Sequence, residues 1–165
     1  MKELILIRHA KSSWSNPLLE DFERPLNKRG GKNAPFMAKV LKQKEVNPDL
    51  IISSPSKRTK DTLEFFIKEF DYKRKIIFEE SIYEAPYLNI LKVVKNIDDK
   101  HKTIFLFGHN PGLNDLADFL LGRFEENIPT CGVLKLNFNI SKWEDIKEKI
   151  GILEFFIYPK MFDKS

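Results

Sequence analysis

The chain has 165 residues, a length that suits one compact domain. Its 28 basic and 24 acidic residues leave a net charge of +4, and no dense Lys/Arg block of the kind found in nucleic-acid-binding arms is present. Cys131 is the one cysteine in the sequence, which excludes an internal disulfide and a cysteine-based structural zinc site.

The first apolar run, residues 4–7, predicts a strand buried on both faces. The run is too short for a signal-peptide core or a membrane span, so we expect a cytoplasmic location. Asn27 is a typical helix N-cap, and the pattern after it predicts a helix to about Lys44. Pro35 and the two glycines before it disfavour the first half, which predicts a late start or a kink.

Strand and helix patterns alternate through the rest of the chain. Short apolar runs predict further strands at residues 50–52, 75–78, 103–107, 133–138 and 152–158. Apolar residues at helical spacing predict helices through residues 63–70, 88–94 and 116–120. Alternation of this kind predicts an α/β fold: a single-domain layered sandwich with a mostly parallel sheet and helices on both faces.

Three of the first four predicted strands end in residues suited to binding phosphate. The first leads into Arg8 and His9, the second into a segment with Arg58, and the fourth into His109. Ligands of open α/β sheets bind outside the carboxyl ends of the strands, so adjacent parallel strands would bring these side chains to one crevice. Two of the segments lead straight into predicted helices, whose N-terminal N–H groups favour an anion. The sequence therefore predicts an anion site with two histidines and two arginines.

The same segments carry a family resemblance. Residues 8–10, Arg-His-Ala, resemble the Arg-His-Gly signature of the histidine phosphatase (phosphoglycerate-mutase-like) superfamily, with Ala10 in place of the usual glycine. Residues 53–59 are similar to the family's second arginine motif, and residues 108–110 to its second histidine motif. Residues 24–30 resemble its Leu-x-x-x-Gly helix start. The Arg-His-Ala-Lys-Ser form, the short chain and the Gly-His-Asn-Pro-Gly segment are similar to the SixA-like branch of phosphohistidine phosphatases.

The resemblance implies that residues 1–165 form a histidine phosphatase-like domain with His9 as its nucleophile. It implies that three further residues bind the phosphoryl group: Arg8, Arg58 and His109. Guanidiniums offer forked donors that match phosphate oxygens, and fixed cationic donors stabilise the charge on a transferring phosphoryl group. The arginines should also lower the pKa of His9 and keep it neutral and nucleophilic near pH 7.

Glu84 is the candidate proton donor to the leaving group. Superfamily members that cleave oxygen esters often use a Glu in a Leu-x-Glu context after the third strand, and residues 82–84, Ile-Tyr-Glu, occupy a similar place. The SixA-like branch does not reliably keep this group, and phosphohistidine already has a good leaving group. The role of Glu84 is therefore open at this point.

These features predict a phosphatase that works through a phosphohistidine intermediate on His9 and acts on protein phosphohistidine, with histidine phosphotransfer domains as expected partners. The alternatives are a small-molecule phosphomonoesterase on the same scaffold and a non-catalytic phosphate-binding module. The presence of both motif histidines argues against the last, because binding alone needs no nucleophile. Three scattered histidines make a poor metal site and no GxxxxGKS loop occurs, so we expect no metal and no cofactor. The lack of a dense basic block and of a long apolar run predicts no nucleic-acid and no membrane partner.

Several other residues have structural interpretations. His101 is expected in a solvated loop, Cys131 in the core as a small apolar residue, and Trp143 in core or edge packing. Trp14 and residues 21–24 belong to the long loop after His9, and such loops often form a rim or lid.

Overall fold

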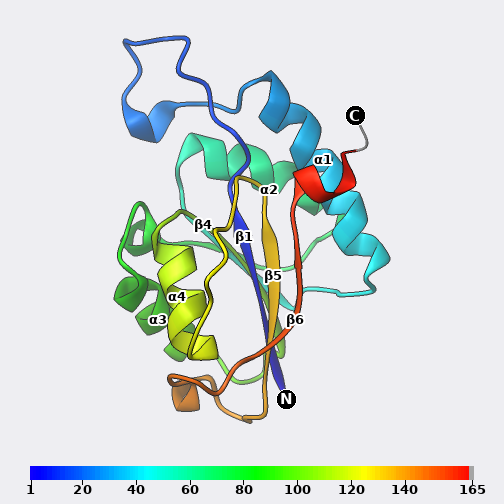
Figure 1. Ribbon diagram of the computed structural model, residues 1–165, viewed down its shortest axis with the longest axis vertical. Coiled ribbons are helices and arrows are strands. Elements are labelled where there is room, and N and C mark those ends of the chain that lie inside the picture. Colours follow the sequence, from blue (N-terminus) through cyan, green and yellow to red (C-terminus); the bar gives the residue numbers. More distant parts are fainter. Residues whose placement is uncertain (164–165) are drawn as a thin grey trace.

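The computed structural model describes residues 1–163 and contains a six-stranded sheet (Figure 1). In chain order, the strands are β1 (Lys2–Arg8), β2 (Leu50–Ser53), β3 (Ile76–Phe78), β4 (Thr103–Gly108), β5 (Val133–Phe138) and β6 (Ile152–Ile157). They lie in the order β3-β2-β4-β1-β5-β6, and every neighbouring pair is parallel except the two that include β5. The predicted α/β fold with a mostly parallel sheet is confirmed.

Helices cover both faces of the sheet. Within residues 1–163 the α-helices are α1 (Lys28–Gln43), α2 (Lys57–Phe70), α3 (Tyr87–Lys95) and α4 (Gly112–Leu121). Helices α1 and α2 pack together on one side, and α3 and α4 on the other (Figure 1). Strand β1 sends Ile5 and Ile7 into the first core and Leu4 and Leu6 into the second, and all four are fully buried. A continuous apolar run is what a strand covered on both faces requires.

Helix α1 begins directly after Asn27, so the prediction of a late start is wrong. The Asn27 side chain accepts a hydrogen bond of 2.8 Å from the backbone N–H of Gly30, which satisfies one free donor of the first turn. A Cβ atom at Gly30 would lie 2.2 Å from the backbone oxygen of Lys11, so only glycine allows this close approach. The cap and the packing offset the low helix propensity of the glycines.

The strand order sets the motif-bearing segments side by side. Strand β4 lies between β2 and β1, with Ser53 opposite Phe107 and Arg8 opposite Gly108 in the parallel registers. The carboxyl ends of all three strands therefore meet at one edge of the sheet. Because β5 is antiparallel, the segment before it begins at this same edge, and the backbone N–H of Cys131 lies 3.0 Å from the oxygen of His9.

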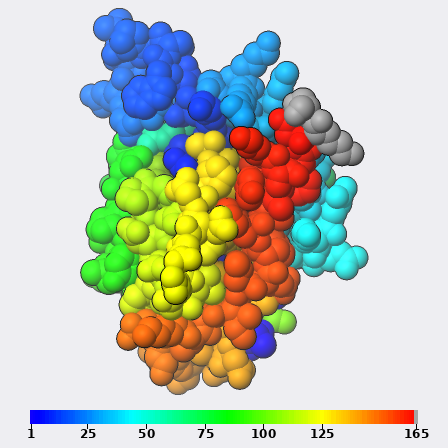
Figure 2. Space-filling model, in the orientation of Figure 1, coloured from blue at the N-terminus to red at the C-terminus, as the bar shows by residue number. Residues whose placement is uncertain are grey.

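The chain between His9 and α1 projects beyond this edge and stands out from the body of the molecule in both overall views (Figures 1 and 2). An isolated bridge between Ser12 and Leu26 closes the base of the loop. A short 3-10 helix, Asp21–Glu23, lies inside it. None of the helices within residues 1–163 is both long enough and apolar enough to cross a membrane.

Candidate active site

His9 follows β1 directly and is 7% exposed. Its Nδ1 lies 2.7 Å from the backbone oxygen of Ala10. A carbonyl oxygen can only accept, so Nδ1 carries the ring proton, and the lone pair of the neutral ring is on Nε2. Burial lowers the pKa of His9 to about 3, and His109, Arg58 and Arg8 add to the lowering. The predicted effect of the arginines is present, but burial is the larger cause, and His9 is neutral at pH 7.

Arg58 lies in the first turn of α2 and is 1% exposed. Its Nε is 3.4 Å from Nε2 of His9, on the side of the ring where the lone pair lies. The two other nitrogens of the guanidinium bind carboxylate and carbonyl groups. Nη1 donates to the backbone oxygen of Asp21 at 2.8 Å, and Nη2 to the carboxylates of Asp21 at 3.0 Å and Glu84 at 2.5 Å.

His109 follows β4 and faces His9, with the two ring centroids 5.2 Å apart. Nε2 of His109 is 2.7 Å from the hydroxyl oxygen of Ser54, a residue that directly follows β2. Nδ1 is 3.2 Å from a carboxylate oxygen of Glu84, and it has no well-aligned hydrogen bond among residues 1–163. The structure thus brings His9, Arg58 and His109 together, while their roles in catalysis stay predictions.

Arg8 completes the positive side of this cluster. Its Nη1 donates a hydrogen bond of 2.8 Å to the backbone oxygen of Ile128, in the segment before β5. Its Nε is buried and has no partner among the residues that the structure describes. Burial lowers the pKa of Arg8, while the charge of Glu84 raises it and that of Arg58 lowers it. Arg8 therefore remains a cation with one buried donor unsatisfied.

Glu84 reaches the cluster from a strained turn. Its φ of +46° lies in the left-handed region that non-glycine residues seldom adopt. Nearby, a Cβ at Gly112 would lie 2.4 Å from the backbone oxygen of Ala85, so glycine lets the start of α4 pack against this turn. The interaction with His109 lowers the pKa of Glu84, and Arg58 lowers it further, against the effect of burial. Glu84 is therefore a carboxylate at pH 7.

Asp21 is a member of the cluster that sequence reasoning placed only in a rim. Its carboxylate pairs with Arg24 and Arg58, at 3.0 Å each, and accepts a hydrogen bond from the hydroxyl of Tyr83. Burial raises the pKa of Asp21, but the hydrogen bonds from Tyr83 and Arg24 and the charge of Arg58 lower it to about 2. No local signal distinguishes Asp21 from the neighbouring acidic residues, because its contacts depend on the folded path of the loop.

Cys131 and Trp143 belong to the core, as predicted, and both are fully buried. Burial raises the pKa of the Cys131 thiol to about 12, so this group is not a thiolate at neutral pH. No group of three or more His, Cys, Asp or Glu side chains suited to a metal ion occurs within residues 1–163.

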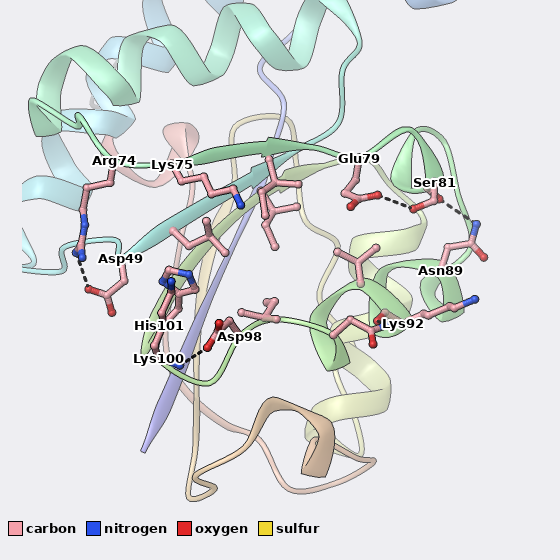
Figure 3. A pocket seen from close by; sticks show the side chains of 16 residues that line it. Asp49, Arg74, Lys75, Glu79, Ser81, Asn89, Lys92, Asp98, Lys100 and His101 are labelled. Atoms are coloured by element: carbon pink, nitrogen blue, oxygen red, sulfur yellow. Dashed lines mark hydrogen bonds and ion pairs between the residues drawn. The ribbon is translucent and has the colours of Figure 1, made fainter.

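A cavity of about 770 Å³ lies away from this cluster, between β2, β3 and α3 (Figure 3). His101, expected in a solvated loop, is a half-buried loop residue on its wall. Groups of both charges line it: Arg74 pairs with Asp49 at 3.2 Å, and the carboxylate of Asp98 accepts a hydrogen bond from the backbone N–H of Lys100 (Figure 3). Neither sign of charge dominates the lining of the cavity.

Comparisons with known proteins give the family and the fold of this chain. Residues 4–90 match the histidine phosphatase superfamily (branch 1). An uncharacterized chloroplastic protein of Arabidopsis thaliana is 32% identical over 153 residues, which cover 87% of this chain and 70% of that protein. An uncharacterized protein of Mycobacterium leprae is 24% identical over 166 residues, with 93% of this chain and 100% of that protein covered.

Solved structures with the same fold include two SixA proteins. The protein assigned as the phosphohistidine phosphatase SixA of Agrobacterium tumefaciens has a TM-score of 0.84 at 25% identity, covering 96% of this chain and 98% of that one. The protein histidine phosphatase SixA complexed with tungstate also has a TM-score of 0.84, at 16% identity, over 98% and 99% of the two chains. Phosphoserine phosphatase of Entamoeba histolytica, in complex with 3-phosphoglyceric acid, has a TM-score of 0.70 at 17% identity, over 97% and 98%. Motifs, fold and relatives agree, and the chain belongs to the histidine phosphatase superfamily, as a phosphatase of its SixA-like branch.

Proposed function

We propose that this chain hydrolyses protein phosphohistidine through a phosphoryl intermediate on Nε2 of His9. Membership of the superfamily supports phosphatase chemistry in general. The neutral ring of His9, with its lone pair beside the guanidinium of Arg58, supports His9 as the nucleophile. A cytoplasmic location and independence of metals are part of the proposal, and the second predicts full activity in a chelator.

The reaction has two displacement steps at phosphorus. In the first, the lone pair of His9 Nε2 attacks, and the bond from phosphorus to the substrate's imidazole nitrogen breaks, with the electron pair going to the leaving imidazole. The phosphorylated His9 ring becomes cationic, and its Nδ1–H bond to the Ala10 oxygen stabilises that charge. In the second step water attacks phosphorus, the Nε2–P bond breaks with its electron pair returning to His9, and the product leaves as H2PO4⁻, which carries both hydrogens of the water.

The two arginines bind the phosphoryl oxygens in this proposal. The buried Nε of Arg8 has no partner within the described residues, and a phosphoryl oxygen would satisfy it. Nη2 of Arg58 would exchange its present carboxylate partners for another phosphoryl oxygen. His109, 5.2 Å from His9 between ring centroids, would lie across the same phosphate and hydrogen-bond to it.

One observation carries the choice of phosphohistidine over an oxygen ester: the carboxyl group of Glu84 lies against Arg58 and His109, which favours its ionised form. Its carboxylate contacts Arg58 and His109, and its pKa is lowered chiefly by His109. An alkoxide leaving group needs a proton from an acid, which an ionised Glu84 does not hold. A protonated phosphohistidine ring leaves as neutral imidazole and needs no such donor. In this proposal Glu84 gives up Nη2 of Arg58 to the phosphoryl group and keeps its contact with Nδ1 of His109, which holds that ring in position.

The test is a comparison of substrates with the unmodified protein and Glu84→Gln. We expect kcat/KM for a phosphorylated histidine phosphotransfer domain and a phosphohistidine peptide to exceed that for common phosphomonoesters. Glu84→Gln should change turnover of phosphohistidine by less than about 5-fold, whereas loss of a needed proton donor costs about 100-fold or more. Preference for a phosphomonoester, together with a 100-fold loss in Glu84→Gln, would instead favour the small-molecule alternative.

A further inference from the structure

The projecting loop after His9 carries large apolar side chains that face solvent. Trp14 is 76% exposed, Leu18 is 91% exposed and Leu19 is 38% exposed. The loop projects past the edge of the sheet where β1 ends (Figures 1 and 2). Single exposed apolar residues are ordinary on protein surfaces, but three of them lie within residues 14–19 of one projecting loop, where a partner could bury them together. We call Trp14, Leu18 and Leu19 the apolar ridge.

Trp14, the aromatic member of the ridge, is held in place by a buried arginine. The guanidinium carbon of Arg24 lies 3.5 Å from the centroid of the Trp14 ring. Arg24 itself is buried and donates to the hydroxyl of Ser12 at 2.5 Å, the backbone oxygen of Ser13 at 3.3 Å and the carboxylate of Asp21. Binding to a surface that is already ordered loses less conformational entropy than binding to a mobile loop.

The same loop continues into the candidate active site. Asp21 pairs with Arg58, and Arg58 lies against His9, so two successive contacts connect the loop to the proposed nucleophile. We propose, on the basis of the proposed function, that the apolar ridge docks the folded protein whose phosphohistidine is hydrolysed. A protein that covers the ridge would bring its surface over the edge of the sheet where His9 lies.

Shape and charge define the partner. The ridge projects, so the complementary surface is an apolar depression, such as the one between two packed helices. Glu20 and Glu23 are exposed on the same loop, and basic side chains around that depression would complement them. A short peptide has no such depression. The ridge should therefore favour a phosphohistidine that stands on a folded domain over the same residue in a peptide.

The experiment compares one phosphohistidine in two contexts: a phosphorylated histidine phosphotransfer domain, and a peptide with that domain's own sequence around the histidine. Leu18→Ser should lower kcat/KM for the domain by about 10-fold or more, mainly through KM, because central apolar contacts dominate interfaces. The same change should leave turnover of the peptide within about twofold. Trp14→Ala should reduce turnover of the domain more than turnover of the peptide.

Ile152→Ser is the matched control. Ile152 is 67% exposed and pairs with Asn137, which lies opposite Glu3 at the other end of β1 from His9. This change should alter neither activity. Equal losses on both substrates in Leu18→Ser, or no loss on the domain, would overturn the docking role. Self-association that Leu18→Ser abolishes, without a substrate-selective loss, would also overturn it and assign the ridge to a second copy of this chain. If the unmodified protein turns over neither substrate, the proposed function itself fails.

Discussion

Lys135 and Arg58 are buried cations that each lie between two carboxylates. The two clusters differ in the protonation states of the groups around the cation. Lys135 on β5 pairs with Glu3 at 2.9 Å and Glu154 at 3.2 Å. Against the effect of burial, the two carboxylates raise the pKa of Lys135. The pKa values of Glu3 and Glu154 are lowered in turn. Every group is held in its charged form, as expected of an ion pair that serves the fold.

The cluster around Arg58 has a different balance. Asp21 and Glu84 are held charged, but His9 beside them is held neutral, with a pKa of about 3. Arg8 keeps a buried donor without a partner among residues 1–163. A group held out of its charged form in a cluster of charges is typical of a reactive site, whereas Lys135, Glu3 and Glu154 are all held in their charged forms. Predictions that separate the two clusters follow, from the largest effect to the smallest.

His9→Ala should abolish both turnover and the phosphoenzyme, a loss of at least about 1,000-fold, because the change removes the group that attacks phosphorus in the first step. Rapid-quench labelling with a radioactive phosphodonor, followed by mapping of the labelled peptide, measures this directly. The label should be acid-labile and alkali-stable, as an N–P bond is. Label on another residue, or normal activity in His9→Ala, would refute the mechanism.

Arg58→Ala should weaken transition-state binding by about 2–4 kcal/mol, a loss of roughly 30- to 1,000-fold in kcat/KM. Arg58→Lys keeps the charge but loses the forked donors, so its activity should be intermediate. Arg123→Ala is the control, because Arg123 forms an exposed pair with Glu125. An unchanged kcat/KM in Arg58→Ala would remove Arg58 from the proposed site.

The free energy of unfolding should fall as the pH drops from about 6.5 to 3. His9 has a pKa of about 3 when folded and about 6.5 when unfolded, so in this window only the unfolded chain binds the proton. One such group contributes a slope of about 1.4 kcal/mol per pH unit. Urea unfolding at a series of pH values should show a shallower slope in His9→Ala, whereas the half-buried control His101→Ala should change it less. Equal slopes in the native protein and His9→Ala would mean that His9 is not held neutral.

Lys135→Met should lower stability by about 1–2 kcal/mol and leave kcat/KM within twofold. The change leaves two carboxylates without their cation, but both are partly exposed, so the loss is smaller than for a fully buried pair. Lys142→Met is the control, since Lys142 and Glu144 form an exposed pair at 4.0 Å. Urea unfolding measures the stability of both variants. A large loss of activity in Lys135→Met would contradict the distinction between the two clusters.

Much of this arrangement can be predicted from the sequence, because parallel strands impose it. The apolar runs mark β1, β2 and β4, and the rule that ligands bind at carboxyl ends brings His9, Arg58 and His109 to one edge. The start of α1 was harder to predict, because the approach of Gly30 to Lys11 is a tertiary contact that overrides helix propensity.

The acidic half of the cluster could be predicted only in part. Glu84 has a motif context, but its left-handed turn and its contact with His109 depend on the packing of α4 against that turn. Asp21 reaches Arg58 across 37 positions of the chain, through a loop whose path no local pattern determines. Contacts of this kind are made by the fold and leave no periodic signal in the sequence.

The carboxylates of Asp21 and Glu84 occupy Nη2 of Arg58, the donor proposed for a phosphoryl oxygen. In the proposed mechanism, the phosphoryl group of the substrate and the phosphate product must each displace these carboxylates from Arg58. The apparent affinity for either is reduced by the fraction of time the donor is free, so a donor that is free one-hundredth of the time weakens binding about 100-fold. Because Asp21 and Glu84 belong to the same chain as Arg58, dilution of the protein does not lower their local concentration. Each time inorganic phosphate leaves, a carboxylate is already within reach of Arg58, which slows rebinding of the product and shortens its stay.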